Sequence, residues 1–265
     1  MRDAINSFFS NDSVFGRIMT KIGIIIGANL MFVLFSIPVV TIGASYAGLY
    51  HVMLKTLRGN GVVNPFKQFW IGFKTNFKQA TIAWVIFAVL MVAGYFNIKI
   101  CSQAEGFINY LQYGVYALGL ALVVIMIYLF PTMAAFENTL PNLIRFGLYF
   151  AFHKPWWLLV NLFFHVFPLY LTYTDAHFRP LYAFIWFFFG FGAIVMLTSR
   201  LLIKDFSRFL PLVDDCGDFI LTEDGKKIMP GSPEEKEYYE SGEGAEGMSD
   251  MTEKEILEEM KKLDM

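Results

Sequence analysis

The sequence predicts an all-α fold, a polytopic membrane helix bundle with about five transmembrane helices, and two observations carry this prediction. Of the 265 residues, 56% are hydrophobic and 18% are aromatic, and the mean hydropathy of +0.49 is higher than a soluble core of this size requires. The chain also holds five charge-free runs, and a helix needs about 20 apolar residues to cross a hydrocarbon core ~30 Å thick. These runs are Ile22 to Leu54, Gln79 to Ile98, Gly106 to Phe136, Pro155 to Thr174 and Pro180 to Ser199.

The first run contains its own interruption, SIPVVTIGASYAGLYH, at positions 36–51. Pro38 lacks a backbone donor and clashes with the preceding turn, and Gly43 tolerates dihedral angles that other residues resist. We therefore expect the first span to end near Val40 and a half-length helix to begin near Ala44. If the segment after Gly43 instead completes a crossing, the chain has six spans.

Thr41 and Ser45 lie at this break, and two interpretations of them are open. Their hydroxyl groups can cap the new helix or bond to carbonyl groups that the break frees. Broken helices also line solute sites in transporters, which makes both residues candidates for a pathway. The chain shows no second half that repeats the pattern, and this favours a bend over a binding site.

The segment PFKQFWIGFKTNFKQA, at positions 65–80, predicts an amphipathic helix that lies in the membrane interface. Asn64 is its expected N-cap and Pro65 its first residue. At about 100° per residue, an aromatic face lies beside a lysine stripe, so rings can enter the acyl chains while ammonium groups reach lipid phosphates. The rings can equally pack against other helices of the same protein, and both can be partly true. The face comprises Phe66, Phe69, Trp70, Phe73 and Phe77, and the stripe comprises Lys67, Lys74 and Lys78.

The third and fourth charge-free runs contain residues that are typical of helix packing and of membrane boundaries. Gly114 and Gly119, in the third charge-free run, suit close packing of helices. Pro155 opens the fourth run together with Trp156 and Trp157, at the depth where indole rings prefer to lie. We expect a short amphipathic segment, LPNLIRFGLYFAFH, between these two runs.

Charge divides the chain into two parts, a membrane helix bundle at 1–210 and an acidic tail at 211–265. The first part has 15 Lys and Arg against 6 Asp and Glu, and the tail has 6 against 17. Within the tail we expect a small hairpin around Glu223 to Gly225, a disordered acidic linker, and a short C-terminal helix that begins at the capping box Thr252-x-x-Glu255.

The distribution of Lys and Arg also predicts the orientation in the cell membrane. With five spans, one side receives 10 basic residues from the 41–78 segment, the 137–154 segment and the flank after the last span, and the other side receives 5. The positive-inside rule then places the tail in the cytoplasm and the N-terminus outside. A sixth crossing would change this topology.

No catalytic signature is present in the sequence: it has no phosphate-binding loop, metalloprotease motif or nucleophile elbow, and we expect no enzyme, cofactor or metal. Polar groups within the spans are few, and Asn29 and His165 are each a candidate either for a pathway or, as we favour, for a structural hydrogen bond. Asp175, His177 and Arg179 form a polar loop that could hold a solute or metal, but polar residues are also expected in any short loop between two spans, and we favour this second explanation.

The basic residues flank the predicted spans instead of forming a patch, which excludes nucleic acid as a partner.

Three linked segments resemble the YesL family of bacterial integral membrane proteins, which occurs mostly in Gram-positive bacteria. They are Asn29-Leu30, the segment PVVTIGAS from Pro38 to Ser45, and FWIGFKTNFKQ from Phe69 to Gln79. The similarity covers roughly residues 8–211. It implies a membrane protein without established catalytic activity, and its members are commonly encoded beside oligosaccharide ABC importers. The family has no agreed functional residues, so none is carried over.

Three functions remain as hypotheses. The leading one is an accessory or regulatory component of oligosaccharide ABC import, whose permease subunits would dock on the aromatic and lysine helix through Phe69, Trp70, Phe73, Lys74, Phe77 and Lys78. The alternative is a small-solute transporter or channel with Asn29, Thr41 and Ser45 at its site. A membrane enzyme acting on lipid-linked sugars would need Asp175, His177 or Glu137, and it is the weakest of the three.

Overall fold

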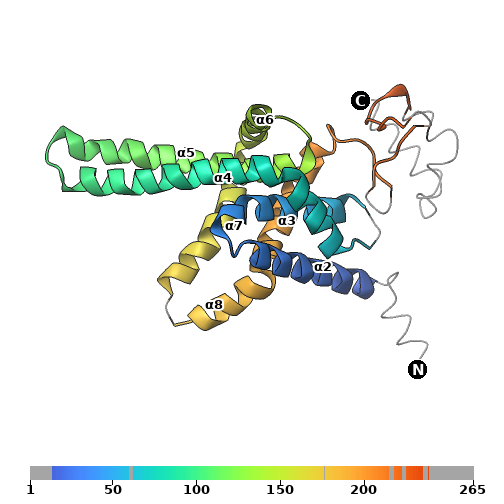
Figure 1. Cartoon of the computed structure of the whole chain (residues 1–265), viewed down its shortest axis with the longest axis horizontal. Helices are drawn as coiled ribbons and strands as arrows, with labels where there is room; N and C mark the ends of the chain where they lie inside the picture. The colour runs from blue at the N-terminus through green and yellow to red at the C-terminus, as the bar shows by residue number, and fades with distance from the viewer. Residues whose placement is uncertain are drawn as a thin grey trace.

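The structure is a computed structural model, and it describes residues 14–59, 62–175, 177–214, 218–222, 225–234 and 238. The predicted all-α class is confirmed, and among the described residues five helices are long and apolar enough to cross a membrane. Figure 1 shows the arrangement of the elements along the molecule's longest axis. They are α2 (Val14–Phe35), η1 (Val39–Thr41), α3 (Ile42–Arg58), α4 (Pro65–Gln103), α5 (Phe107–Ala135), α6 (Leu140–His153), α7 (Pro155–Thr174), α8 (Arg179–Ile185), the π-helical η2 (Trp186–Gly190) and α9 (Phe191–Phe206).

The half-length helix α3 forms the centre of the molecule. It packs against α2, α4, α5 and α9, and Figure 1 shows it enclosed between α2 and α4. Its 17 residues span about 25 Å, less than a full crossing. Its fully buried side chains include Leu49, Tyr50, Val52 and Met53. The break in the first charge-free run therefore creates the core helix as well as a bend.

The break itself falls a few residues earlier than predicted. Helix α2 ends at Phe35 and α3 begins at Ile42, with η1 between them. The Thr41 hydroxyl lies 2.6 Å from the Phe35 carbonyl oxygen and 2.7 Å from that of Pro38, and the Ser45 hydroxyl donates to the Thr41 carbonyl at 3.0 Å. Both hydroxyl groups thus satisfy carbonyls around the break, as their sequence positions suggested.

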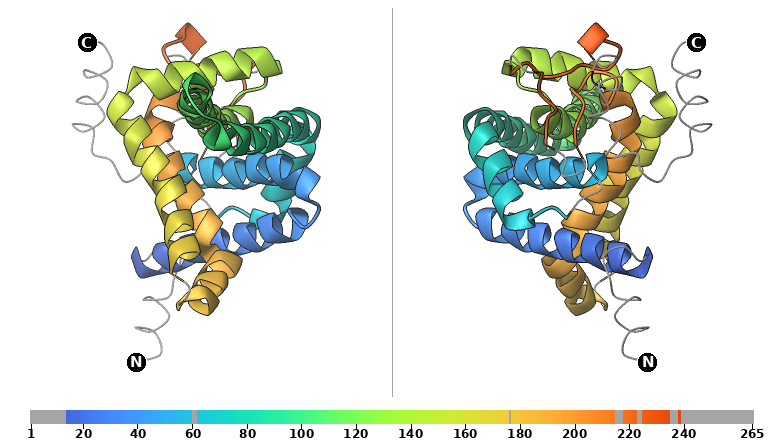
Figure 2. Two further views of the ribbon diagram at one scale, coloured as in Figure 1. Left: turned by 90° about the vertical axis from the view of Figure 1, so that its left-hand side faces the viewer. Right: turned by 90° about the vertical axis from the view of Figure 1, so that its right-hand side faces the viewer.

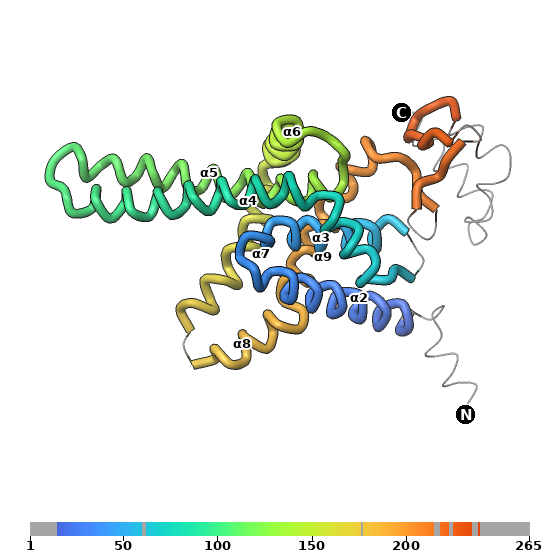
Figure 3. The backbone as a smooth tube through the Cα atoms, viewed as in Figure 1, coloured from blue at the N-terminus to red at the C-terminus, as the bar shows by residue number. Residues whose placement is uncertain are grey.

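Helices α4 and α5 form a long hairpin, which Figures 1 and 3 show as two rods side by side. The expected amphipathic helix and the second span are one continuous helix of 39 residues. Asn64 caps it as predicted, because its side-chain oxygen accepts from the backbone N–H of Phe66 at 3.1 Å and of Lys67 at 3.2 Å. Gly114 and Gly119 were expected to be packing positions, but a Cβ at either would meet nothing within 4 Å.

The helices after α6 run across this hairpin. Figure 2, which looks along the hairpin from either end, shows α7 and the α8–α9 rod crossing the direction of α4 and α5. Lys154, at the start of α7, bonds to Asp205 near the end of α9 at 2.6 Å. This ion pair joins the ends of two helices that lie far apart in sequence.

The described start of the tail packs on the helices. Isolated antiparallel bridges pair Val213 with Phe219 and Leu221 with Lys227. A small hairpin was expected around Glu223 to Gly225, and two of those three residues lie outside the described part. Ile228 is buried. The predicted C-terminal helix, and most of the predicted acidic linker, lie outside the described residues.

Candidate functional site

Asn29 on α2 ties the first span to the π-helical segment before α9. Its amide nitrogen donates to the carbonyls of Trp186 at 3.0 Å and Phe187 at 2.7 Å, and its side-chain oxygen accepts from the backbone N–H of Gly192 at 2.8 Å. A π-bulge displaces backbone groups from the regular helical ladder, and a buried amide can supply the missing partners. Asn29 has no exposed surface, so this geometry is that of a structural hydrogen bond between helices.

His165 on α7 belongs to a buried polar chain that crosses the core. Its Nδ1 lies 2.9 Å from the Asn161 carbonyl, and its Nε2 lies 3.4 Å from the Tyr50 hydroxyl. The Thr198 hydroxyl lies 3.2 Å from the Tyr50 hydroxyl and 3.1 Å from the Val195 carbonyl, and its single proton can be donated to either oxygen. Because Nδ1 faces a carbonyl, it carries the proton, which leaves Nε2 to accept from Tyr50. These polar contacts connect α3, α7 and α9.

His165 also lines an apolar cavity of about 560 Å³. Helix α3 contributes Tyr46 to this cavity, and Trp84, Phe130 and Trp186 come from α4, α5 and the π segment. The lining is mostly aromatic and aliphatic, which suits an acyl chain or an apolar solute better than a sugar.

The sequence-predicted docking residues on α4 divide between core and surface. Phe69 and Phe73 are buried, and their rings lie 5.7 Å and 5.0 Å from the Phe35 ring. The surface members are named here the α4 docking surface and comprise Trp70, Lys74, Phe77 and Lys78, all of which are exposed. Phe69 and Phe73 therefore pack within the protein, as one interpretation expected, whereas Trp70 and Phe77 are exposed, and their insertion among acyl chains stays a prediction.

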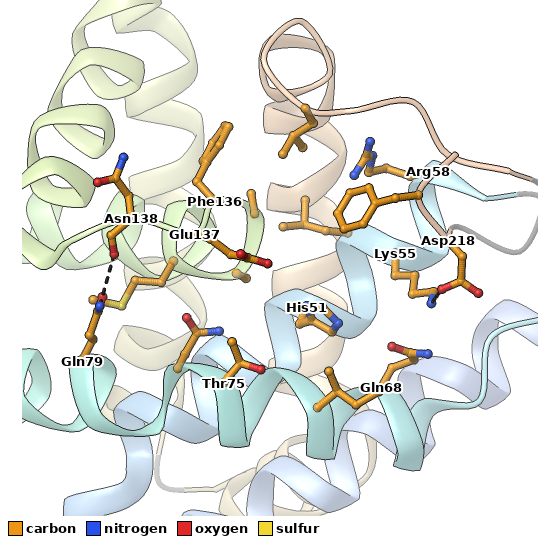
Figure 4. A pocket seen from close by; sticks show the side chains of 18 of the residues that line it. His51, Lys55, Arg58, Gln68, Thr75, Gln79, Phe136, Glu137, Asn138 and Asp218 are labelled. Carbon is orange, nitrogen blue, oxygen red and sulfur yellow. Dashed lines mark hydrogen bonds and ion pairs between the residues drawn. The ribbon is translucent and has the colours of Figure 1, made fainter. Parts of the chain in front are cut away.

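A second cavity, named here the polar cavity, has a volume of about 600 Å³ and brings four segments together (Figure 4). Helix α3 supplies His51, Lys55 and Arg58, and α4 supplies Lys67, Gln68, Thr75, Asn76 and Gln79. The α5–α6 connection supplies Phe136, Glu137 and Asn138, and the tail supplies Asp218 and Phe219. Sequence reasoning missed this cavity, although His51, Lys55 and Arg58 are spaced by four and three, which places them on one helix face.

Lys55 is a largely enclosed cation of the polar cavity. Its ammonium nitrogen bonds to the Asp218 carboxylate at 2.5 Å, and the Lys55 side chain is 13% exposed whereas that of Asp218 is 69% exposed. Arg58 donates to the Pro211 carbonyl and lies 5.8 Å from the centre of the Phe219 ring. No described residue offers Arg58 a carboxylate within ion-pair distance.

Burial shifts the protonation of two groups in the polar cavity. Desolvation lowers the pKa of the Arg58 guanidinium from its ordinary value. Desolvation also lowers the pKa of His51, with a smaller lowering from the charge of Lys55, while hydrogen bonds with the Ala134 backbone and the Gln68 side chain partly oppose both. His51 is thus held in its neutral form, so the positive charge of the cavity comes from Lys55, Arg58 and Lys67.

The remaining acidic candidates serve local contacts. The Asp175 carboxylate accepts from the backbone N–H of His177 at 3.1 Å and from the Tyr182 hydroxyl at 3.4 Å, which is the geometry of a turn. Glu137 is 83% exposed and lies 3.8 Å from Lys227. Within the described part of the chain, no group of three His, Cys, Asp or Glu is arranged to hold a metal ion.

Comparison with known proteins gives a partial assignment. Residues 25–98, which run from α2 through most of α4, match the family described as "Protein of unknown function, DUF624". The chain is 24% identical over 119 residues to "Uncharacterized protein YteU" of Bacillus subtilis (strain 168), which covers 45% of this chain and 54% of YteU. The chain thus spans about half the length of that curated relative. No solved structure matches this chain. Both comparisons therefore show similarity to proteins without an established function, and the family match covers less than half of the chain.

Proposed function

We propose that this chain is a non-enzymatic integral membrane protein that acts as an accessory or regulatory component of oligosaccharide ABC import. The resemblance to the YesL family suggests the process. The observation that carries a docking role is the α4 docking surface, where Trp70, Lys74, Phe77 and Lys78 are exposed on one ordered helix. Trp is enriched among the residues that anchor protein interfaces.

The use of the polar groups inside the molecule favours binding over catalysis. Asn29 bonds to backbone groups of the π segment and of α9, and His165 bonds to the Asn161 carbonyl of its own helix and lies 3.4 Å from the Tyr50 hydroxyl of α3. Asp175 and Glu137 make turn and surface contacts. A partner with apolar groups and carboxylates on its surface would complement the α4 docking surface, because it pairs the lysines and covers the rings.

The test is affinity purification of the tagged full chain from detergent-solubilised membranes, with the bound proteins identified by mass spectrometry. We expect permease subunits of an ABC importer to be recovered with the wild type. The combined variant Trp70→Ala, Lys74→Gln, Phe77→Ala should lose them. The matched control is Tyr95→Ala, Phe96→Ala, Lys99→Gln, which removes two exposed rings and one lysine from the other end of the same helix.

Repeated recovery of no importer subunit with the wild type would refute the proposal. Equal recovery with both triple variants would refute the assignment to the α4 docking surface while leaving the partner in place. Membrane levels of each variant are measured in parallel, so that loss of binding is separated from loss of protein.

A second candidate, a small-solute transporter or channel, is supported by one observation. The series of polar contacts through Thr198, Tyr50 and His165 ends at the apolar cavity of about 560 Å³. A solute in this cavity would therefore meet the His165 side chain. Purified protein in proteoliposomes is tested for flux of sugars and ions. Flux that His165→Leu abolishes would favour transport, and no flux across the panel leaves the accessory role.

A further inference from the structure

We propose that the polar cavity binds the phosphate group of a small hydroxylated molecule or lipid headgroup, with Lys55 and Arg58 as the phosphate contacts and Asp218 occupying Lys55 when the site is empty. This site is separate from the α4 docking surface, and the proposal holds whichever partner docks there. Figure 4 shows Lys55, Arg58 and Asp218 gathered at one side of the cavity.

The charges around the cavity favour an anion. Lys55 and Arg58 lie three residues apart on the last turn of α3, so their head groups reach the same space. Arg58 lacks a carboxylate partner among the described residues, and a half-buried cation is stabilised strongly by an anion that accepts several hydrogen bonds. The flat guanidinium and the ammonium together match the spread of oxygens on a phosphate.

The size and the neutral lining favour a ligand larger than phosphate alone. A volume of about 600 Å³ falls within the range of roughly 300–1,000 Å³ that small-molecule sites occupy. The wall formed by α4 carries the amides of Gln68, Asn76 and Gln79 and the hydroxyl of Thr75. Amides and hydroxyl groups both donate and accept hydrogen bonds, as the hydroxyl groups of a polyol or sugar require.

Asp218 acts as a displaceable internal anion. Its side chain is 69% exposed although it bonds to the enclosed Lys55, and ion pairs with an exposed partner contribute little to stability. A phosphate that takes over Lys55 must therefore separate this pair and release the tail segment that carries Asp218. Binding at the polar cavity and docking of that segment are then mutually exclusive at Lys55, and each weakens the other.

The first experiment measures binding of glucose 6-phosphate to the full chain in phosphatidylcholine nanodiscs by isothermal titration calorimetry. Glucose and inorganic phosphate serve as the two halves of the probe, and we expect the intact probe to bind more tightly than either. Arg58→Gln should weaken binding at least tenfold. Asp218→Asn should tighten it about fivefold, since it removes the competing carboxylate. Lys74→Gln, an exposed lysine of α4 outside the cavity, is the control and should leave binding unchanged.

The second experiment separates the two sources of phosphate. The detergent-purified chain is incubated with phosphatidylglycerol, and native mass spectrometry counts the lipid molecules it retains. Retention that Arg58→Gln abolishes and Lys74→Gln preserves identifies a lipid headgroup as the ligand, whereas tight glucose 6-phosphate binding without such retention identifies a soluble one.

The gain of affinity in Asp218→Asn keeps the proposal testable even if Arg58→Gln fails to fold, because a gain requires a folded site. Failure of the wild type to bind either probe would overturn the proposal. It would also be overturned if Lys74→Gln lost as much binding as Arg58→Gln, since that result indicates attraction to positive charge in general.

Discussion

At the scale of single residues, Asn29 shows why a polar side chain is retained within an apolar span. One amide bonds to three backbone groups, the carbonyls of Trp186 and Phe187 in the π segment and the N–H of Gly192. Lipid cannot replace these hydrogen bonds, so removal of the Asn29 amide should destabilise the packing of α2 against the last span.

Asn29→Leu keeps the volume of the side chain and removes all three hydrogen bonds. We expect a loss of about 2 kcal/mol in the free energy of unfolding, from bonds that contribute roughly 0.6–1 kcal/mol each. Reversible unfolding in mixed micelles measures this loss. The control is Asn97→Leu, because Asn97 is exposed on α4. A variant at position 29 as stable as that control would contradict the structural role.

His51 gives a pH dependence whose sign follows from its environment. Burial lowers the folded-state pKa of His51 below its ordinary value near 6.5. The unfolded chain therefore binds a proton more readily, and stability is full above about pH 6.5 and falls as the pH drops toward the folded-state pKa. Thermal unfolding in detergent between pH 5 and 8 tests this. We expect His51→Gln to flatten the decline on the acidic side, and an unchanged slope in that variant would argue against it.

At the scale of elements, the break between α2 and α3 sets the position of the core helix. Gly43 lies where α3 crosses α4, and a Cβ there would stand 2.4 Å from the Ala80 carbonyl oxygen and 2.6 Å from the Trp84 Cβ. The Trp84 ring nitrogen also donates to the Val39 carbonyl at 2.8 Å. Helix α4 therefore contacts both the break and the start of α3, with no room for a side chain at position 43.

Gly43→Val should prevent α3 from packing on α4 and reduce the amount of folded protein in the membrane several-fold, because overpacking at backbone contacts costs about 1–3 kcal/mol or more. Gly114→Val and Gly119→Val are matched controls, since both positions face open space. Membrane levels and size-exclusion profiles in detergent report the effect. Normal membrane levels of Gly43→Val with loss of its binding partner would instead identify the break as a working site.

Comparison of elements shows what local sequence could predict. The Asn64–Pro65 start of α4, the break at Pro38 and the charge-free spans follow from capping, backbone chemistry and hydropathy, and each acts within a few residues. The sequence predicted an amphipathic helix and a separate span, whereas α4 is one continuous helix. The change from an amphipathic to an apolar segment does not end a helix when no Pro or helix-breaking Gly lies at the junction. The π segment held by Asn29 and the link of the polar cavity to Asp218 depend on contacts across more than 150 residues, and the burial of α3 depends on contacts such as Tyr50 with Thr198, 148 residues apart. No local pattern encodes these contacts.

At the scale of the whole molecule, the polar cavity joins segments that the charge distribution assigns to one side of the membrane. Its lining comes from the 41–78 segment, the loop after α5 and the tail. Lys227 lies 3.8 Å from Glu137, which connects the tail to that loop again. Meanwhile the α4–α5 turn lies at the far end of the hairpin (Figure 3). The structure thus groups these segments together, and the positive-inside rule predicts that their side is the cytoplasm.

Cysteine labelling tests this orientation and the number of crossings together. In a background with Cys101→Ala and Cys216→Ala, three single variants are made: Asn11→Cys, Glu105→Cys and Lys226→Cys. With five crossings, a membrane-impermeant maleimide should label positions 11 and 105 in intact cells and position 226 only after permeabilisation. Six crossings would place positions 11 and 226 on the same side, since an even number of spans returns the chain to where it began. Labelling of position 226 in intact cells, with position 105 protected, would invert the topology and place the polar cavity outside the cell.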